Sequence, residues 1–137
     1  MTEQKVQYKQ LITGFEFTPS TFQMDADTVV AYKKATEDND PVYAGKIVPS
    51  MAVAAIAMAA MADKFEVLPG TIHVSQQLDF LKAVYTGETL ISYAGVKRKV
   101  ERGSFNMLNI TIRVENAKKE TVMTAETGFI LPEVKNG

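Results

Sequence analysis

The sequence of 137 residues contains no cysteine, no tryptophan and a single histidine, His73. Without cysteine the chain cannot form a disulfide framework, a thiolate metal site or a cysteine nucleophile. With one histidine, no mechanism or metal site can draw two imidazoles from the same chain. The position of His73 within an expected strand favours a structural role for it.

An excess of charge of either sign is also missing, since 15 Lys and Arg stand against 16 Asp and Glu. The basic residues are spread along the chain, so we expect no surface for nucleic acid. The first ten residues, MTEQKVQYKQ, lack the apolar core of a signal peptide, which favours a cytoplasmic location. The length predicts one domain, residues 1–137, and the 46% of apolar residues suffice for a core.

The longest apolar run has twelve residues, Met51–Ala62, which is short of the roughly 20 that a membrane-spanning helix needs. Its seven alanines favour helix, and a helix that is apolar on all sides must be enclosed by protein. Ser50 is the expected N-cap, and Asp63-Lys64 marks the return to solvent. We therefore predict a buried central helix over Ser50–Lys64 and no membrane partner.

Extended segments separated by turns follow this helix. The pattern predicts strands over Thr71–Tyr85, Thr89–Val100, Phe105–Glu115 and Thr121–Leu131. The third segment is the clearest, because its apolar residues alternate with polar ones at the period of a half-buried strand.

Two further elements are expected before the central helix. Val6–Glu16 is predicted to be an edge strand, and Asp25–Thr36 a short helix whose apolar side holds Val29, Val30 and Tyr32. This order predicts an α+β fold of the hotdog type, in which one curved antiparallel sheet of consecutive strands wraps around the central helix. One such sheet leaves an edge and a flank of the helix uncovered, so we expect a homodimer or a larger assembly.

Three segments carry a resemblance to a known family. GTIHVSQQLDFLKAVYTGETL (Gly70–Leu90) resembles a strand of the MaoC-like dehydratases, the (R)-specific enoyl-CoA hydratases, where Gly-Thr, Gln, Phe-Leu and Val-Tyr-x-Gly-Glu/Asp-Thr-Leu recur in this order. ATEDNDPVY (Ala35–Tyr43) is similar to the family's hydratase motif, Ala-Thr-Gly-Asp-x-Asn-Pro-Ile/Leu-His. KIVPSMAVAAIA (Lys46–Ala57) sits where the family carries Ile-Ala-His-Gly-Met before its central helix. The resemblance spans Glu16–Pro132.

The resemblance implies a hotdog protein that acts on acyl thioesters of coenzyme A or of an acyl carrier protein, with no cofactor or metal of its own. Asp38 falls on the family's catalytic aspartate, while Tyr43 occupies the position of its catalytic histidine, five residues on. Asp40 replaces the asparagine of the motif, and Glu37 replaces its glycine. These departures bear directly on whether the family's chemistry survives.

The helix start departs from the family as well. Pro49-Ser50 stands in for the His-Gly pair, where a backbone N–H of the family holds the thioester carbonyl. The resemblance therefore implies Asp38, Tyr43 and Ser50 as catalytic candidates. Three further residues are implied to contact the substrate, namely Asp40, Pro49 and Met51.

Hydration of an enoyl thioester needs a base for water, an acid for C2 and donors for the developing enolate oxygen. Asp38 can serve as the base, but a phenol titrates near pH ~10, so Tyr43 can only donate a hydrogen bond. Losing one acid–base partner costs about 10²–10⁴-fold in rate. Asp38 as a solvated turn carboxylate and Tyr43 as a packing aromatic remain the competing interpretations.

Three other groups of residues give weaker indications of function. The acidic stretch Glu37–Asp40 lacks the spacing of a calcium loop, so we expect no metal. The basic stretch Lys97–Lys99, with Arg102, either meets phosphates of coenzyme A or forms a solvated strand face. Met51, Met58 and Met61 are core residues first and the lining of an acyl tunnel second.

Three classes of function remain open. The first is an acyl-thioester hydratase or dehydratase with a modified site at Asp38 and Tyr43. The second is a non-catalytic acyl-thioester-binding protein, including a subunit of a heterodimer whose partner bears both aspartate and histidine. The third and weakest is a hotdog thioesterase, because no acidic residue lies between Ser50 and Ala62, where several such enzymes carry it.

Overall fold

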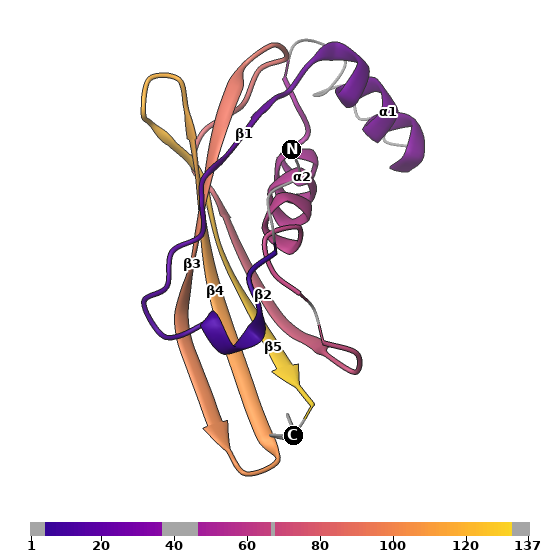
Figure 1. The fold of residues 1–137 in the computed structure, drawn as a ribbon. Helices are drawn as coiled ribbons and strands as arrows, with labels where there is room; N and C mark the ends of the chain where they lie inside the picture. The colour runs from indigo at the N-terminus through magenta and orange to yellow at the C-terminus, as the bar shows by residue number, and fades with distance from the viewer. Residues whose placement is uncertain (1–4, 37–46, 67, 133–137) are drawn as a thin grey trace.

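The computed structural model describes residues 5–36, 47–66 and 68–132 (Figure 1). These residues form one antiparallel sheet of five strands, in the order β1-β3-β4-β5-β2, which confirms the predicted α+β hotdog fold. In the described part of the chain, no helix is long and apolar enough to cross a membrane. The elements are η1 (Tyr8–Gln10, a 3-10 turn), β1 (Ser20–Gln23), α1 (Ala26–Thr36), α2 (Ser50–Ala62), β2 (Ile72–Phe80), β3 (Thr89–Arg102), β4 (Phe105–Asn116) and β5 (Thr121–Leu131).

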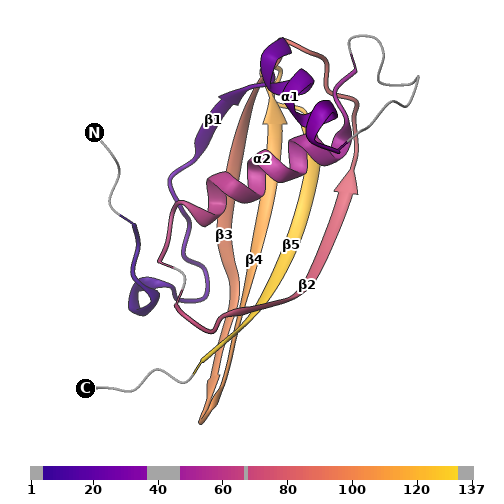
Figure 2. The same ribbon diagram turned by 90° about the vertical axis from the view of Figure 1, so that its right-hand side faces the viewer.

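Helix α2 is the predicted central helix, and it lies across β3, β4 and β5 (Figure 2). The face of the sheet that carries α2 is called the helix face below, and the opposite face the outer face. Ala52, Val53 and Ala57 are buried against the sheet, whereas Met51 is 51% exposed. The helix is therefore covered on one side by the sheet, and the first turn leaves Met51 exposed, as expected for a helix that a single sheet cannot cover completely.

The start of α2 differs from the prediction by one residue. Pro49, not Ser50, is the N-cap, because its backbone is extended (φ −54°, ψ 130°) while its carbonyl accepts the N–H of Ala52 at 2.9 Å. At the other end, Asp63 caps the helix by donating its N–H to the carbonyl of Ala59 at 3.1 Å. The predicted return to solvent at Asp63-Lys64 is confirmed.

The alternation predicted for the third strand segment holds in β4. Leu108, Ile110, Ile112 and Val114 are all buried on the helix face. β4 lies between β3 and β5, so this row of aliphatic side chains forms the centre of the core. Period-two patterning succeeds here because one face of the strand is fully covered.

A bulge in β3 places Lys97 and Lys99, two members of the basic cluster Lys97–Lys99, on opposite faces of the sheet. The pairing with β4 shifts between Val96 and Arg98, which leaves Lys97 as the extra residue. Lys97 lies on the outer face, where its Nζ is 2.8 Å from a carboxylate oxygen of Glu126. Lys99 turns to the helix face, and its side chain is only 11% exposed. The three residues therefore present no common surface to a phosphate.

The segment Val6–Glu16 is not the predicted edge strand. It makes an isolated parallel bridge at Val6, passes through η1, and reaches an isolated antiparallel bridge between Glu16 and Gly95. Gly14 turns the chain between these points with a φ of 91°, which glycine adopts without strain. The edge beside β3 is formed instead by the short strand β1.

Helix α1 confirms the helix predicted over Asp25–Thr36. Asp25 caps it, since its Oδ1 accepts the backbone N–H of Thr28 at 2.8 Å, and this bond lowers the pKa of the Asp25 carboxyl. Val29 is buried as expected. Val30, by contrast, is 62% exposed and does not belong to the apolar side.

Strand β2 is shorter than predicted and lies elsewhere in the sheet. It pairs with β5 rather than with β3, the next strand along the chain, so the strands are not simply consecutive. It ends at Phe80 because the N–H groups of Leu81 and Lys82 both turn to the carbonyl of Val122, at 2.9 and 3.4 Å. The chain then crosses to the far side of the sheet to begin β3.

Candidate functional site

The first turn of α2 is the part of the predicted site that the structure describes. Pro49 is buried, Ser50 is half-buried and Met51 is exposed. The first N–H groups of a helix have no intrahelical acceptor, and here no side-chain cap is seen within the described residues. These N–H groups and the positive end of the helix dipole can stabilise a developing oxyanion.

A small hollow beside this turn is lined by described residues. The described residues enclose a hollow of about 10 Å³, roughly the room that one water needs. The hollow is lined by Val48, Ser50, Val53, Phe80, Lys82, Val84, Val122 and Met123.

Lys82 is a residue of this site that the sequence did not single out. It belongs to the short crossing after β2, and its ammonium forms an ion pair with the carboxylate of Glu120. Hydrogen bonds from Lys82 and then from Asn116 lower the pKa of the Glu120 carboxyl. A cation is therefore held beside the α2 N-terminus, where it can meet an anionic carrier group.

Three of the predicted site residues, Asp38, Asp40 and Tyr43, lie outside the described residues. The described chain resumes at Ile47, which forms a bridge with Tyr85, and Val48 donates its N–H to the carbonyl of Val84 at 2.8 Å. The roles of these three residues remain predictions. Across the ranges 5–36, 47–66 and 68–132, no group of three His, Asp or Glu side chains could hold a metal ion.

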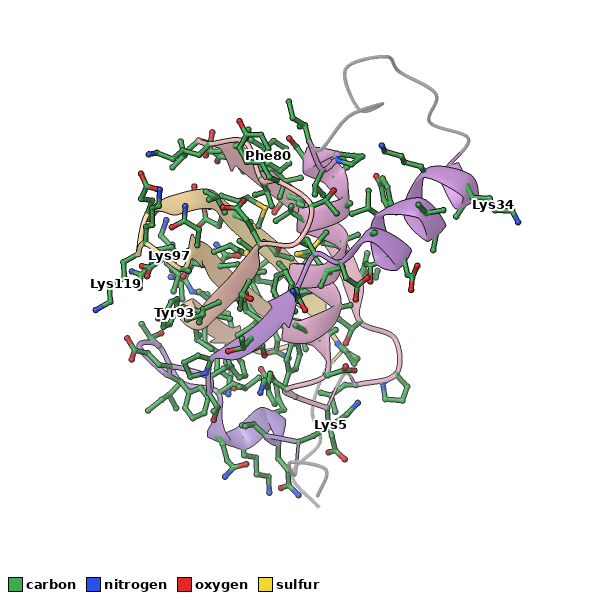
Figure 3. The ribbon with its side chains drawn as sticks, turned by 90° about the horizontal axis from the view of Figure 1, so that it is seen from above. Lys5, Lys34, Phe80, Tyr93, Lys97 and Lys119 are labelled. Carbon is green, nitrogen blue, oxygen red and sulfur yellow. The ribbon has the colours of Figure 1, made fainter. Side chains whose placement is uncertain are left out.

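A larger hollow of about 740 Å³ lies on the outer face of the sheet. Tyr93 and Lys97 lie on this face, turned away from α2 (Figure 3). Its basic groups are paired: Lys97 with Glu126, and Arg113 with Glu115 at 3.0 Å. Arg113 also stacks over the ring of Tyr93 at 4.7 Å. Because the sheet separates this hollow from the α2 N-terminus, it is not the predicted site.

His73 lies on β2 at a bulge, where the pairing with β5 shifts between His73 and Ser75. Its ring lies 5.2 Å from the ring of Phe129, and its Nε2 is 2.9 Å from the carbonyl oxygen of Ser75. Phe129 packs in turn against the buried Phe65. His73 is thus an exposed residue of the helix face, which the expectation of a structural role did not anticipate.

Comparison with known protein families assigns the chain to one family. Residues 11–125 match the family model described as FAS1-like, dehydratase domain region. A comparison with curated protein sequences found no match.

Solved structures of hydratases and dehydratases share the fold. The R-hydratase PhaJ1 from Pseudomonas aeruginosa is 23% identical, with a TM-score of 0.77 over 95% of this chain and 90% of that chain. The MaoC-like dehydratase from Rhodospirillum rubrum is 15% identical, with a TM-score of 0.74 over 94% and 98%. The HadBC complex, a 3R-hydroxyacyl-ACP dehydratase from Mycobacterium tuberculosis, is 22% identical, with a TM-score of 0.73 over 89% of this chain and 98% of that chain. At these identities the similarity establishes the hotdog fold.

Proposed function

Because the chain belongs to the family of FAS1-like dehydratase domain regions and has the hotdog fold of MaoC-like hydratases, we propose that it acts on acyl thioesters. The reaction is the addition of water to a 2-enoyl thioester, or its removal from a 3-hydroxyacyl thioester. The acyl group is carried on coenzyme A or on an acyl carrier protein. Neither direction requires a metal or an organic cofactor.

The observation that carries this proposal is the uncapped first turn of α2. Pro49 is the N-cap of the helix. No side chain of the described residues accepts a hydrogen bond from the backbone N–H groups that follow it. In the proposed reaction a base takes a proton from water as the oxygen bonds to C3 of the substrate. The electron pair of the C2–C3 bond moves toward the thioester oxygen, which the N–H of Ser50 stabilises. C2 then takes up a proton.

Asp38 and Tyr43 complete this site in the proposal. Asp38 holds or deprotonates the water, while the neutral phenol of Tyr43 donates a hydrogen bond. Asp40, Pro49 and Met51 contact the acyl group. The spacing of Asp38 and Tyr43 along the sequence supports these roles, because it equals that of the aspartate and histidine in the family motif.

The assembly we propose is a dimer that forms through β2. This strand lies at the end of the sheet and pairs only with β5 among the described residues. Phe80 and Leu81 are 41% and 57% exposed at one end of the strand, and Ile72 and Val74 are exposed at the other end. Such an apolar, unpaired edge is a template for pairing. A stable dimer buries about 1,200 Å² or more in total.

A second candidate is a non-catalytic subunit that pairs with a hotdog chain bearing both aspartate and histidine. Tyr43 at the position of the family's histidine favours it. The HadBC complex, which has the same fold, is a dehydratase complex. The two candidates differ in whether the purified chain alone hydrates a substrate.

The test is hydration of crotonyl-CoA by the purified chain and by two variants at the start of α2. Ser50→Pro removes one N–H while keeping the helix, because proline is favoured at the first helical position and the extended Pro49 suits a following proline. Ser50→Ala keeps the N–H and is the matched control. We expect Ser50→Pro to lower kcat by about 10²–10³-fold and Ser50→Ala to retain activity.

Two results separate the candidates. If the unmodified chain shows no hydration but binds butyryl-CoA in calorimetry, the non-catalytic candidate is supported. If it neither hydrates crotonyl-CoA nor binds butyryl-CoA, the proposed function is wrong.

A further inference from the structure

The bulge in β2 determines which face of the sheet receives His73. Gln77 and Asp79 line the hollow on the outer face, while Phe80 lines the hollow beside Ser50 on the helix face. Strict alternation back from Phe80 would send residue 73 to the outer face. The extra residue at Val74 reverses this, so His73 stacks on Phe129 on the helix face. Re-aiming a side chain is a recognised effect of such bulges.

Within its own chain, His73 is far from the α2 N-terminus along β2. β2 runs from Ile72 to Phe80, and only its last residue reaches the hollow beside Ser50. Figure 2 shows the N-terminal end of α2 on the β2 side of the sheet, near the end of that strand. His73 and Ser50 of one chain therefore lie toward opposite ends of the same edge.

A second copy paired antiparallel along β2 brings these two ends together. The two-fold axis stands perpendicular to the sheet, so both α2 helices stay on the helix face. Opposed residues of such a pair share a face, which places the axis at Gln76 or Gln77 when most of the strand is paired. Because Val74 is the extra residue of the bulge, His73 then faces the partner's Leu78 or the partner's Phe80. In the first register the partner's Phe80 is the next residue along the same face, and in the second it lies directly opposite His73.

We propose that His73 of each copy is supplied to the α2 N-terminus of the other, as the imidazole of the thioester site. This inference rests on the proposed function and adds a residue from the partner copy to its site. It accounts for the position of the one histidine of the sequence, which is exposed on a strand that pairs only with β5 among the described residues. The occupant of the β2 edge is a second copy of this chain.

The chemistry suits an imidazole, because one ring can accept a proton as a general base and return it as a general acid. His73 accepts a proton from water as the oxygen bonds to C3 of the enoyl thioester. The electron pair passes to the thioester oxygen held by the N–H of the partner's Ser50. The imidazolium returns its proton to C2 as the carbonyl re-forms, so one water is added and no other reactant is consumed.

The absence of native cysteine makes the pairing directly testable. A residue on the two-fold axis lies opposite itself, at a Cβ separation of about 4.5–5.5 Å, close enough for a disulfide after small shifts. We expect Gln76→Cys or Gln77→Cys to cross-link into a covalent dimer under mild oxidation. Thr111→Cys, which is exposed on β4 away from the edge, is the control and should stay monomeric on a denaturing gel. If neither β2 variant cross-links, the proposal is overturned, whatever the activity of the chain.

Subunit mixing tests the role of His73 in trans. His73→Asn and Ser50→Pro should each lose crotonyl-CoA hydration as homodimers. A mixed dimer holds one site with the native His73 from one copy and the native Ser50 from the other. Equal mixing with subunit exchange should restore roughly a quarter of the native rate, because half of the dimers are mixed and one of their two sites is intact. No recovery, with exchange verified by mass spectrometry, overturns the proposal.

A binding readout keeps the inference separate from catalysis. If the native chain does not hydrate crotonyl-CoA, the hydratase candidate fails, but the imidazole resonances of His73 can still be followed by NMR without overlap. Addition of butyryl-CoA should shift them in the native dimer and not in Ser50→Pro. Resonances that do not move in a native dimer that binds butyryl-CoA place His73 away from the thioester and overturn the proposal. Sedimentation must show that His73→Asn remains dimeric; a monomeric variant is replaced by His73→Gln.

Discussion

Tyr8 donates its phenolic hydrogen to Oε1 of Glu101, 93 residues further along the chain, at a distance of 3.2 Å. Lys99 joins the two residues: its Nζ lies 3.9 Å above the Tyr8 ring, 3.0 Å from the Tyr8 carbonyl oxygen and 3.4 Å from Glu101. This cluster attaches the N-terminal segment to the far end of β3. Burial, followed by the charge of Glu101 and the hydrogen bond to it, raises the pKa of Tyr8 to about 12.

The first prediction concerns this hydrogen bond. Tyr8→Phe should lower the free energy of unfolding by about 0.5–1.5 kcal/mol at neutral pH. The raised pKa means that the folded state resists tyrosinate, so the contribution of Tyr8 is complete below its ordinary pKa of 10.0 and is lost as pH rises through about 12. Denaturation curves at several pH values should show the native chain and Tyr8→Phe converging over this range. A difference that grows with pH contradicts the assignment, and Tyr85→Phe is an exposed control.

The second prediction concerns the crowding at Gly128. A Cβ added there would meet Oγ of Ser75 and lie 3.2 Å from Oδ1 of Asn109. Gly128→Ala should therefore destabilise the fold by about 1–3 kcal/mol, as overpacking does. Ser75→Ala removes the nearer atom, so the double variant should recover part of the loss. Additive effects in a double-mutant cycle, measured by chemical denaturation, would exclude this contact as the cause.

The third prediction concerns the turn between β4 and β5. Oδ1 of the buried Asn116 accepts the N–H groups of Lys118 and Glu120, each at 3.0 Å. Asn116→Ala leaves both donors without this acceptor and should lower the free energy of unfolding by about 1–3 kcal/mol. Lys118→Ala, which keeps the backbone bonds, should change stability by less than ~0.5 kcal/mol. Equal losses for the two variants would show that the amide cap contributes nothing.

The fourth prediction tests the proposed chemistry at Tyr43. Tyr43→His restores the acid–base group of the family motif and should raise crotonyl-CoA hydration by about 10²-fold. Asp38→Asn in that background should abolish the gain, because the imidazole then lacks its carboxylate partner. Steady-state rates of the three proteins decide between the alternatives. A gain that survives Asp38→Asn would show that Asp38 does not act with the residue at position 43.

The sequence predicted those elements whose patterns are local. The apolar run of α2, the alternation of β4 and the strand Thr121–Leu131 each carry their own signal, and all three are confirmed. The N-terminal segment was misassigned because its apolar residues contact the core through single bridges rather than through a ladder. The sequence also did not predict that β2 pairs with β5, because the residue pattern of a strand does not indicate which distant strand it pairs with.

The site was less accessible to sequence reasoning than the fold. The bulges at Val74 and Lys97 change the face of the sheet on which the side chains beyond them lie. The residue types at these two positions do not predict a bulge. Lys82 comes beside Ser50 only because the chain turns after Phe80. Ser50 itself was identified by resemblance, and the structure places it at the start of α2.

The strand order also governs how the molecule is made. α2 and β2 precede β3, β4 and β5, on which they pack or pair, so a ribosome releases the most apolar helix before any of its cover exists. The hairpins β3–β4 and β4–β5 involve short loop closures and should form first, whereas β2 must wait for β5, the final strand. The nascent chain therefore carries an uncovered Met- and Ala-rich helix until β5 has been synthesised, a state prone to aggregation and suited to chaperone binding.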